Sequence, residues 1–395
     1  MRLRGRRARV GLAAALIALC GALVAAVVLH LSGPAGGRTV TVMTRNLYLG
    51  ADINRPVRAA ASGTGRDAVL ALGHANHDVG QIVARTDFVT RSRLLAGEIA
   101  TARPDLVGLQ EVALWRHGPM QLNRLGLPDA AEVDYDFLQM LLAELAARRM
   151  TFDVARVQPE SDVEAAAFTG DPFRGTERET EDVRLTVRDV ILVRHAAGLR
   201  VLNSGGGHYR HGLDVTLGGA PFSFVRGFAW VDVVTSGSYR FRFVTTHLES
   251  QSADLALVQA GELLAGPAAD ARASVVIVCD CNSDPANLAV RPGDSVAESA
   301  PYQLLTKHGG FADMWLRKQP SAGPGFTAGL SELVNDSTPA GFNRRLDLVL
   351  ARPAPGARLT VSRADVTGEE VTNRDRRTGL WPSDHAGVVL SLRSS

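Results

Sequence analysis

Lysine is nearly absent from this sequence. Only Lys307 and Lys318 are lysines, although lysine and arginine together number 43, so almost all positive charge is carried by guanidinium groups. Aromatic residues make up 6% of the chain, and no stretch combines clustered basic residues with interleaved aromatic ones. The sequence therefore lacks the pattern of a surface that binds nucleic acid by base stacking and phosphate contacts.

Cysteine is also scarce, and three cysteines exclude a disulfide-based scaffold. Cys20 lies in an apolar run near the N-terminus, which leaves Cys279 and Cys281 in the rest of the chain. Side chains at i and i+2 of a strand share one face, and these two sulfur atoms would meet only through a strained ring. We interpret both as small buried hydrophobic residues, with a metal-binding or redox pair as the alternative.

Acidic residues are missing from positions 1–37, which carry five arginines: Arg2, Arg4, Arg6, Arg7 and Arg9. Without this segment, 38 basic residues face 41 acidic residues, and the net charge changes from +2 to −3. The nearly neutral body gives no general attraction to a polyanion. A composition of 46% hydrophobic and 21% charged residues excludes disorder of the whole chain.

An unbroken apolar run, residues 10–31, follows the arginines. This order is typical of a secretory signal or an uncleaved signal anchor, and the length approaches the ~20 residues that span a bilayer. A buried core helix is the alternative. We predict a leader with a short linker at 1–37 and one catalytic domain at 38–395. The domain would lie outside the cytoplasm, either secreted or anchored, with membrane contact through the N-terminal helix if it is not cleaved.

The body alternates strand-like and helical patterns. Helices are expected at 87–102, 136–149 and 253–265 from apolar spacing of three and four residues. Short apolar runs predict strands at 39–47, 105–112, 186–195, 222–235, 239–248, 274–280, 345–352 and 386–392. This mixture predicts sheets covered by helices. Segments 50–86 and 161–182 are interpreted as long surface loops, and Gly205–Gly207 as a turn.

Polar residues collect at the edges of these strands. Asn46, Glu111, His247 and Asp280 each end an apolar run. Four more follow the same pattern near later strands, namely Asn282, Asp347, Asp384 and His385. Each signal alone is weak, because a lone acid at a strand end is usually solvated and a lone histidine is usually structural. The ordered set indicates reactive groups held at one edge of a sheet.

The set resembles the endonuclease/exonuclease/phosphatase superfamily, the DNase I-like proteins, in the manner of an exported bacterial-type member. The resemblance runs from Thr39 to Leu392. It rests on TRN (44–46), LQEV (109–112), TTHL (245–248), CDCNSDP (279–285), RRLDLVL (344–350) and WPSDH (381–385). It implies a four-layered α/β sandwich of two packed mixed β-sheets flanked by helices. It also implies metal-dependent hydrolysis of phosphoesters.

The resemblance assigns the metal site to Glu111, with Asn46 and Asp384 beside it. Mg²⁺ is the expected ion, with Mn²⁺ or Ca²⁺ as alternatives, because Mg²⁺ prefers carboxylate and amide oxygens. Arg345 is a candidate substrate contact within a rim of arginines.

The same resemblance gives the catalytic roles. Asp280 would position or deprotonate the attacking water, and Asn282 would bind a phosphate oxygen or steady Asp280. His385, oriented by Asp347, would contact or protonate the phosphate, and His247 would be a phosphate donor or general acid. The family's mid-chain arginine or tyrosine has no assigned position; Tyr135, Arg188 and Arg226 are candidates by order alone.

The expected activity is an extracytoplasmic Mg²⁺-dependent phosphodiesterase. Nucleic acid is the favoured substrate, only because nucleases are frequent in the family that the sequence resembles. A sphingomyelinase or phospholipase C-like enzyme acting on phospholipid is one alternative, and a catalytically silent binding domain on the same fold is another. The sequence does not determine the oligomeric state.

Overall fold

The computed structural model describes residues 39–395, apart from residues 62, 125, 218, 270–271 and 319–322. The predicted leader at 1–37 lies outside these residues. Among the helices that the structure does describe, none has the length and apolar character needed to cross a membrane.

The first sheet has eight strands in the order β15-β16-β1-β2-β6-β3-β4, with β5 paired to β6. β1 and β2 are parallel, and β16 runs antiparallel to β1. The strands are β1 (Thr39–Asn46), β2 (Leu106–Gln110), β3 (Leu114–Gly118), β4 (Glu132–Asp136), β5 (Phe152–Thr169), β6 (Arg178–Arg194), β15 (Leu359–Thr367) and β16 (Gly387–Ser394).

The second sheet has six strands in the order β13-β14-β12-β11-β10-β7. β11 and β12 are parallel, whereas β14 is antiparallel to β12. The strands are β7 (Leu199–His208), β10 (Gly227–Thr235), β11 (Arg240–His247), β12 (Ser274–Asp280), β13 (Ala312–Asp313) and β14 (Asp347–Arg352). A separate hairpin pairs β8 (Leu213–Leu217) with β9 (Ala220–Phe224).

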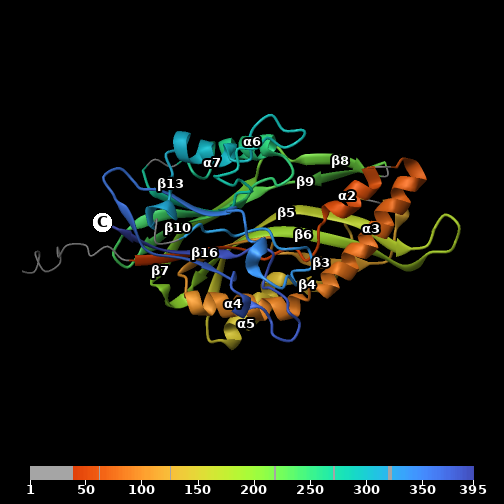
Figure 1. Cartoon of the computed structure of the whole chain (residues 1–395), viewed down its shortest axis with the longest axis horizontal. Helices are drawn as coiled ribbons and strands as arrows, with labels where there is room; N and C mark the ends of the chain where they lie inside the picture. The colour runs from red at the N-terminus through yellow and green to blue at the C-terminus, as the bar shows by residue number, and fades with distance from the viewer. Residues whose placement is uncertain (1–38, 62, 125, 218, 270–271, 319–322) are drawn as a thin grey trace, which may run out of the picture.

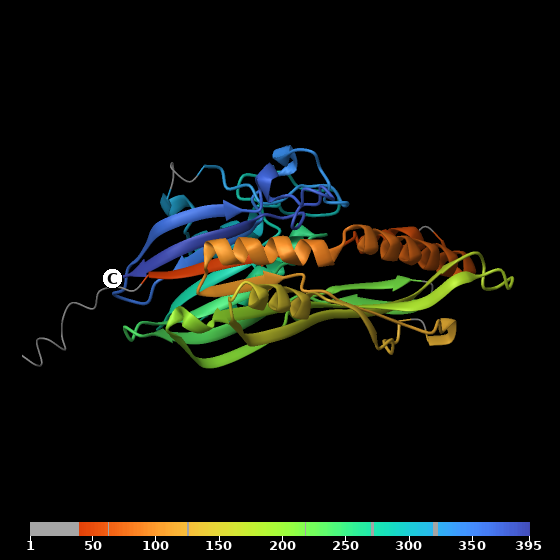
Figure 2. The ribbon, with the colours of Figure 1, turned by 90° about the horizontal axis from the view of Figure 1, so that it is seen from below.

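Helices cover the outer faces of both sheets. The α-helices are α2 (Asn54–Ala61), α3 (Gly65–Arg85), α4 (Phe88–Ala102), α5 (Phe137–Ala147), α6 (Ala253–Ala265) and α7 (Ala300–Gln303). Short helical turns are η1 (Leu122–Arg124), η2 (His195–Ala197), η3 (Leu304–His308), η4 (Leu316–Lys318), η5 (Pro339–Gly341) and η6 (Val371–Asn373). Figures 1 and 2 show α4 and α5 on one side of the molecule, with α6 and α7 on the other side in Figure 1. The predicted four-layered sandwich is confirmed.

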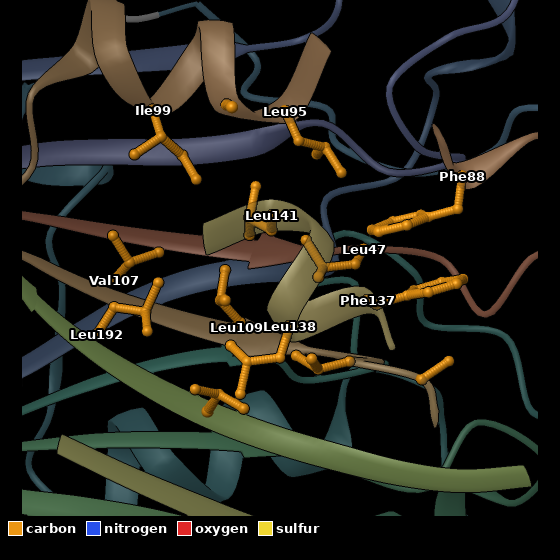
Figure 3. Close-up of a cluster of buried hydrophobic side chains, with 14 of the residues drawn as sticks. Leu47, Phe88, Leu95, Ile99, Val107, Leu109, Phe137, Leu138, Leu141 and Leu192 are labelled. Atoms are coloured by element: carbon orange, nitrogen blue, oxygen red, sulfur yellow. The ribbon is translucent and has the colours of Figure 1, made fainter. Parts of the chain in front are cut away.

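Apolar side chains fill each interface between the layers. The inner faces of the two sheets meet over residues such as Val42, Ile191 and Phe243. Between the first sheet and its helices, Phe88 of α4 stacks on Phe137 of α5 with ring centroids 3.4 Å apart (Figure 3). Because the interfaces between the layers are apolar, polar reactive side chains are expected at the ends of the strands.

One end of the molecule is formed by α2, α3, the β8–β9 hairpin and the β5–β6 turn, which we call the arm (Figure 1). A small apolar core containing Ala60, Leu72, Leu217 and Phe222 joins these elements. The prediction of a surface loop at 50–86 is wrong, because α2 and α3 occupy it. Apolar residues of α3 recur at helical spacing but are separated by charged and histidine residues that hide the pattern in the sequence.

The loop predicted at 161–182 is also wrong, because β5 and β6 form a long hairpin there. Their register shifts at three places, including Pro159/Asp162, and each shift breaks the alternation of apolar and polar residues. The run at 222–235 is two strands, β9 and β10, separated by Val225 and Arg226.

The predicted turn at Gly205–Gly207 lies inside β7. Trp230 of the neighbouring strand packs over Gly205, where a Cβ atom would lie 2.5 Å from the indole ring. These glycines therefore make room for a neighbouring side chain and do not end the strand.

Cys279 and Cys281 form a disulfide, with Cα atoms 5.1 Å apart. Both residues are fully buried, as predicted, but their interpretation as unpaired hydrophobic residues is wrong. The face-sharing argument assumed a continuous strand, whereas β12 ends at Asp280.

Candidate active site

Residues at the ends of four central strands meet at one place. In the second sheet, His247 of β11 pairs in register with Asp280 of β12, and Asp280 pairs with Asp347 of β14. From the first sheet, Asn46 Nδ2 donates to Asp280 Oδ2 at 3.0 Å. The site therefore spans the junction of both sheets, and these four side chains are held by the strands that carry them.

His385 is bound into this junction by two carboxylates. Its Nδ1 lies 2.8 Å from Asp347 Oδ2 and 3.7 Å from Asp280 Oδ2. Burial opposes the charged imidazole, but Asp347, Asp280 and Asp384 together raise the pKa of His385 well above its usual value. His385 is thus a charged imidazolium, and its Nε2 remains for a substrate oxygen.

Asp280 is ionised in the same surroundings. Burial acts to raise its pKa, but His385, His247 and the amide of Asn46 hold the pKa below the ordinary value. The backbone N–H of Asn282 also donates to Asp280 Oδ1 at 3.1 Å. An ionised carboxylate that is fixed from two sides has the properties of a proton acceptor for a bound water.

A second pair of acids, Glu111 and Asp384, faces this group. Glu111 follows β2 in a left-handed conformation, with φ of 55°, and its Oε2 accepts a bond from Leu49 N at 3.0 Å. Burial and the charge of Asp384 raise the pKa of Glu111 to about 7. Burial likewise raises the pKa of Asp384. Two half-buried carboxylates that repel each other fit a divalent cation, which would remove the repulsion.

The predicted metal ligands do not coincide with the tightest cluster of ligand atoms. Asp280, Asp347 and His385 offer atoms within 4.8 Å of one another. A protonated imidazole has no free nitrogen for a metal, so a cation site at Glu111 and Asp384, with Asn46 beside them, stays the prediction. The other acidic cluster, which contains Glu164, accepts backbone N–H groups and has a structural explanation.

His247 is held as a neutral ring. Arg226 Nη1 donates to His247 Nδ1 at 2.9 Å, and His247 Nε2 lies 3.5 Å from Asp280 Oδ2. Burial and the charge of Arg226 lower the pKa of His247 to about 3. Asn282 Nδ2 lies 2.9 Å from the same Nε2 and donates to Leu248 O. Of the two roles predicted for His247, these surroundings favour a neutral hydrogen-bond donor over a general acid.

Arg226, one of the three mid-chain candidates by order alone, is the one that reaches the site, where it contacts His247. It lies between β9 and β10, its guanidinium is largely buried, and Glu249 Oε2 lies 3.8 Å from it. Burial opposes its charge, but Glu249, Glu160 and Glu111 raise the pKa of Arg226. The signal in the sequence was Gly227, where a Cβ atom would overlap the carbonyl oxygen of Gly207. The close contact between the backbones of Gly227 and Gly207 holds the backbone next to Arg226 in place.

Two further acids near Arg226 were missed. Glu160 and Asp189 are buried, and their carboxylate oxygens have no side-chain or backbone hydrogen bond in the described chain. Burial raises the pKa of Glu160 to about 8. Burial, followed by the charge of Glu160, raises the pKa of Asp189 well above its ordinary value. No sequence motif marks either residue, since their raised pKa values come mainly from burial in the folded chain.

The remaining arginine candidates have structural partners. Arg345 is 7% exposed, and its Nη2 donates to Asp313 Oδ2 at 2.7 Å, so it is a buried cation and not part of an exposed rim. Its predicted substrate contact stays a prediction. Arg188 donates to Asp136, the N-cap residue of α5, at 2.6 Å.

The model of the endonuclease/exonuclease/phosphatase family matches residues 76–385. The chain belongs to this family. No protein in a search of curated sequences matches it. Members of the family hydrolyse phosphoesters and generally depend on a divalent metal ion, so the chain is a hydrolase by family.

Solved structures of the family share the fold. A Bacteroides thetaiotaomicron family protein is 13% identical over 90% of this chain and 98% of its own, with a TM-score of 0.50. D. rerio TDP2 with a single-strand DNA product is 16% identical over 90% and 98%, with a TM-score of 0.47. A mannosyl-6-phosphatase from Bacteroides thetaiotaomicron is 15% identical over 89% and 99%, with a TM-score of 0.47. At these identities the likeness concerns the fold alone.

Proposed function

We propose that the protein is a Mg²⁺-dependent phosphoester hydrolase that uses Asp280 to activate water. The observation that carries this proposal is the arrangement of an ionised Asp280 beside a charged His385, with the acid pair Glu111 and Asp384 opposite. Hydrolysis needs a positioned water, a proton acceptor and positive charge on the phosphate oxygens, and these residues offer all three.

Each side chain has one task in this proposal. Asp280, oriented by Asn46, takes a proton from the attacking water. His385, held by Asp347, places its charged ring on a phosphate oxygen. His247 and Arg226 contribute further donors. Glu111 and Asp384 would hold Mg²⁺, which when bound supplies positive charge to the phosphate and to the leaving oxygen.

Phosphodiesters are the bond class expected from the sequence, and nucleic acid stays the first class to test. The nuclease prediction depends on family frequency alone. We also propose that the domain works outside the cytoplasm behind an N-terminal leader. A mass measurement on secreted protein would test both export and cleavage of residues 1–37.

The decisive experiment compares the full-length chain in Mg²⁺ and in chelator on plasmid DNA, RNA, sphingomyelin and bis(p-nitrophenyl) phosphate. We expect chelator to abolish turnover, and Asp280→Asn to lower kcat by about 10² to 10⁴. Asp232→Asn is the matched control, because Asp232 pairs with Arg242 on the same sheet, away from the strand ends. Turnover that survives both chelator and Asp280→Asn would refute the proposal.

A further inference from the structure

A small cavity opens directly beside the acid pair of the site. It has a volume of about 180 Å³, and Glu111, Asp384 and Arg226 lie among its lining residues. We propose that this cavity receives the alcohol part of the substrate, and that the substrate is a small, singly phosphorylated polyol of about one sugar ring. The inference rests on the proposed hydrolase function and narrows its substrate class.

The size of the cavity suits a small organic group. Pockets for drug-sized ligands measure about 300–1,000 Å³. A cavity of about 180 Å³ lies below that range, as expected for a group of about one ring.

The walls of the cavity are formed in part by the β8–β9 hairpin of the arm. Leu213 of β8 and Phe224 of β9 contribute apolar surface from the arm hairpin. The hairpin is fixed at this place by its apolar core with α2 and α3. On the near side, Ser161 Oγ donates to Val225 O at 3.0 Å and so joins β5 to the end of β9. The cavity is therefore a built feature of the fold.

The polar lining suits hydroxyl groups. Asn54, Ser250 and Gln251 line the same cavity as the apolar residues, and their side chains carry amide and hydroxyl groups. Ser250 and Gln251 are held in place because both backbone N–H groups donate to Glu249 Oε1 at 2.8 Å. An apolar wall for a ring face, together with donors and acceptors at its edge, is the arrangement that recognises a polyol.

The charges around the cavity oppose a polyanion. Asp52 in the lining pairs with Arg58, and Arg55 nearby pairs with Glu332. Arg226 is likewise accompanied by Glu249. A polynucleotide would need uncompensated cations for its neighbouring phosphates, whereas these three arginines are each matched by an acid. The electrostatics therefore favour a substrate with one phosphate group.

The reaction balances with water as the only co-reactant. The water oxygen forms a bond to phosphorus while the bond from phosphorus to the alcohol oxygen breaks. The proton that leaves the water passes through Asp280, and the alcohol oxygen is released carrying a proton. The products are inorganic phosphate and the free polyol.

The test measures phosphate release from a hexose 6-phosphate in Mg²⁺ by the full-length chain and two pairs of variants. Leu213→Trp fills the cavity, and Thr216→Trp places the same ring on the exposed opposite face of β8. We expect Leu213→Trp to lower kcat/KM at least tenfold, mainly through KM, and Thr216→Trp to stay within twofold. Gln251→Leu, at an exposed position, should raise KM without affecting folding.

The outcomes separate this inference from the proposed function. Plasmid or oligonucleotide cleavage that depends on Mg²⁺ and Asp280, with a kcat/KM above that for the hexose phosphate, overturns the inference and keeps the hydrolase. Hexose phosphate turnover that neither Leu213→Trp nor Gln251→Leu changes also overturns it. If no phosphoester is turned over in Mg²⁺, the proposed function itself fails.

Discussion

At the scale of single residues, the site assigns different tasks to chemically similar groups through their surroundings. His247 is a buried imidazole at the end of β11, and His385 is a half-buried imidazole just before β16. Three carboxylates raise the pKa of His385, whereas burial and one arginine lower the pKa of His247. One histidine is therefore a cation and the other a neutral donor, although the sequence presents them alike.

The bond between His385 and Asp347 leads to a prediction. Because Asp347 acts through His385, the double variant His385→Ala/Asp347→Asn should lose little more kcat/KM than His385→Ala alone. Steady-state kinetics on bis(p-nitrophenyl) phosphate measure kcat/KM for the wild-type chain, both single variants and the double variant. The matched control is His195→Ala. It removes an exposed histidine that also contacts an aspartate, Asp153, and it should leave kcat/KM unchanged. Fully additive losses would show that Asp347 has a separate task.

The sequence predicted the residues that lie in motifs, and it missed those defined by burial. Asn46, Asp280 and His385 were identified because each ends or precedes an apolar strand in the family's order. Glu160 and Asp189 lie inside strands, where an acid is ordinarily on the solvent face. Burial raises both pKa values, and the charge of Arg226 opposes the rise; burial by residues distant in sequence is not visible in a local pattern.

At the scale of elements, segments with clean periodicity were predicted well and segments with irregular register were not. The helix expected at 253–265 has these bounds as α6, and the strand expected at 274–280 has them as β12. In contrast, α3 and the β5–β6 hairpin were interpreted as loops. Helix α3 and the β5–β6 hairpin stabilise each other through the packing of α3 against β5. A contact between segments so far apart in sequence cannot be predicted from a local pattern.

The contact of α3 with β5 depends on one glycine. A Cβ atom at Gly73 would overlap the ring of Phe168, which is fully buried in β5. We predict that Gly73→Ala lowers the free energy of unfolding by about 1–3 kcal/mol through overpacking. Gly80 in the same helix has nothing within 4 Å of such an atom, so Gly80→Ala should raise stability by about 0.5–1 kcal/mol. Denaturant unfolding of both variants measures this difference, and equal effects would contradict it.

At the scale of the whole molecule, the site includes residues from both sheets, and the predicted cation would bind between them. If Glu111 and Asp384 bind Mg²⁺ only when both sheets are folded, the ion must stabilise the native state. At an ion concentration about 100 times the Kd, the gain is ~2.7 kcal/mol.

Thermal unfolding in Mg²⁺ and in chelator tests this prediction without any substrate. Glu111→Gln should abolish the Mg²⁺-dependent rise in Tm. Glu132→Gln, whose carboxylate is 78% exposed, should keep it. An equal rise in both variants would place the ion elsewhere.

The pairing of Thr39 with Arg393 brings the beginning and the end of the described chain together. Asn46 lies at the opposite end of β1, about 23 Å away for eight residues of strand. A linker, a fusion partner or a solid support attached at either end would therefore hold the enzyme by the side remote from Asn46. The catalytic strand ends would point outward, and immobilised protein should keep its access to substrate.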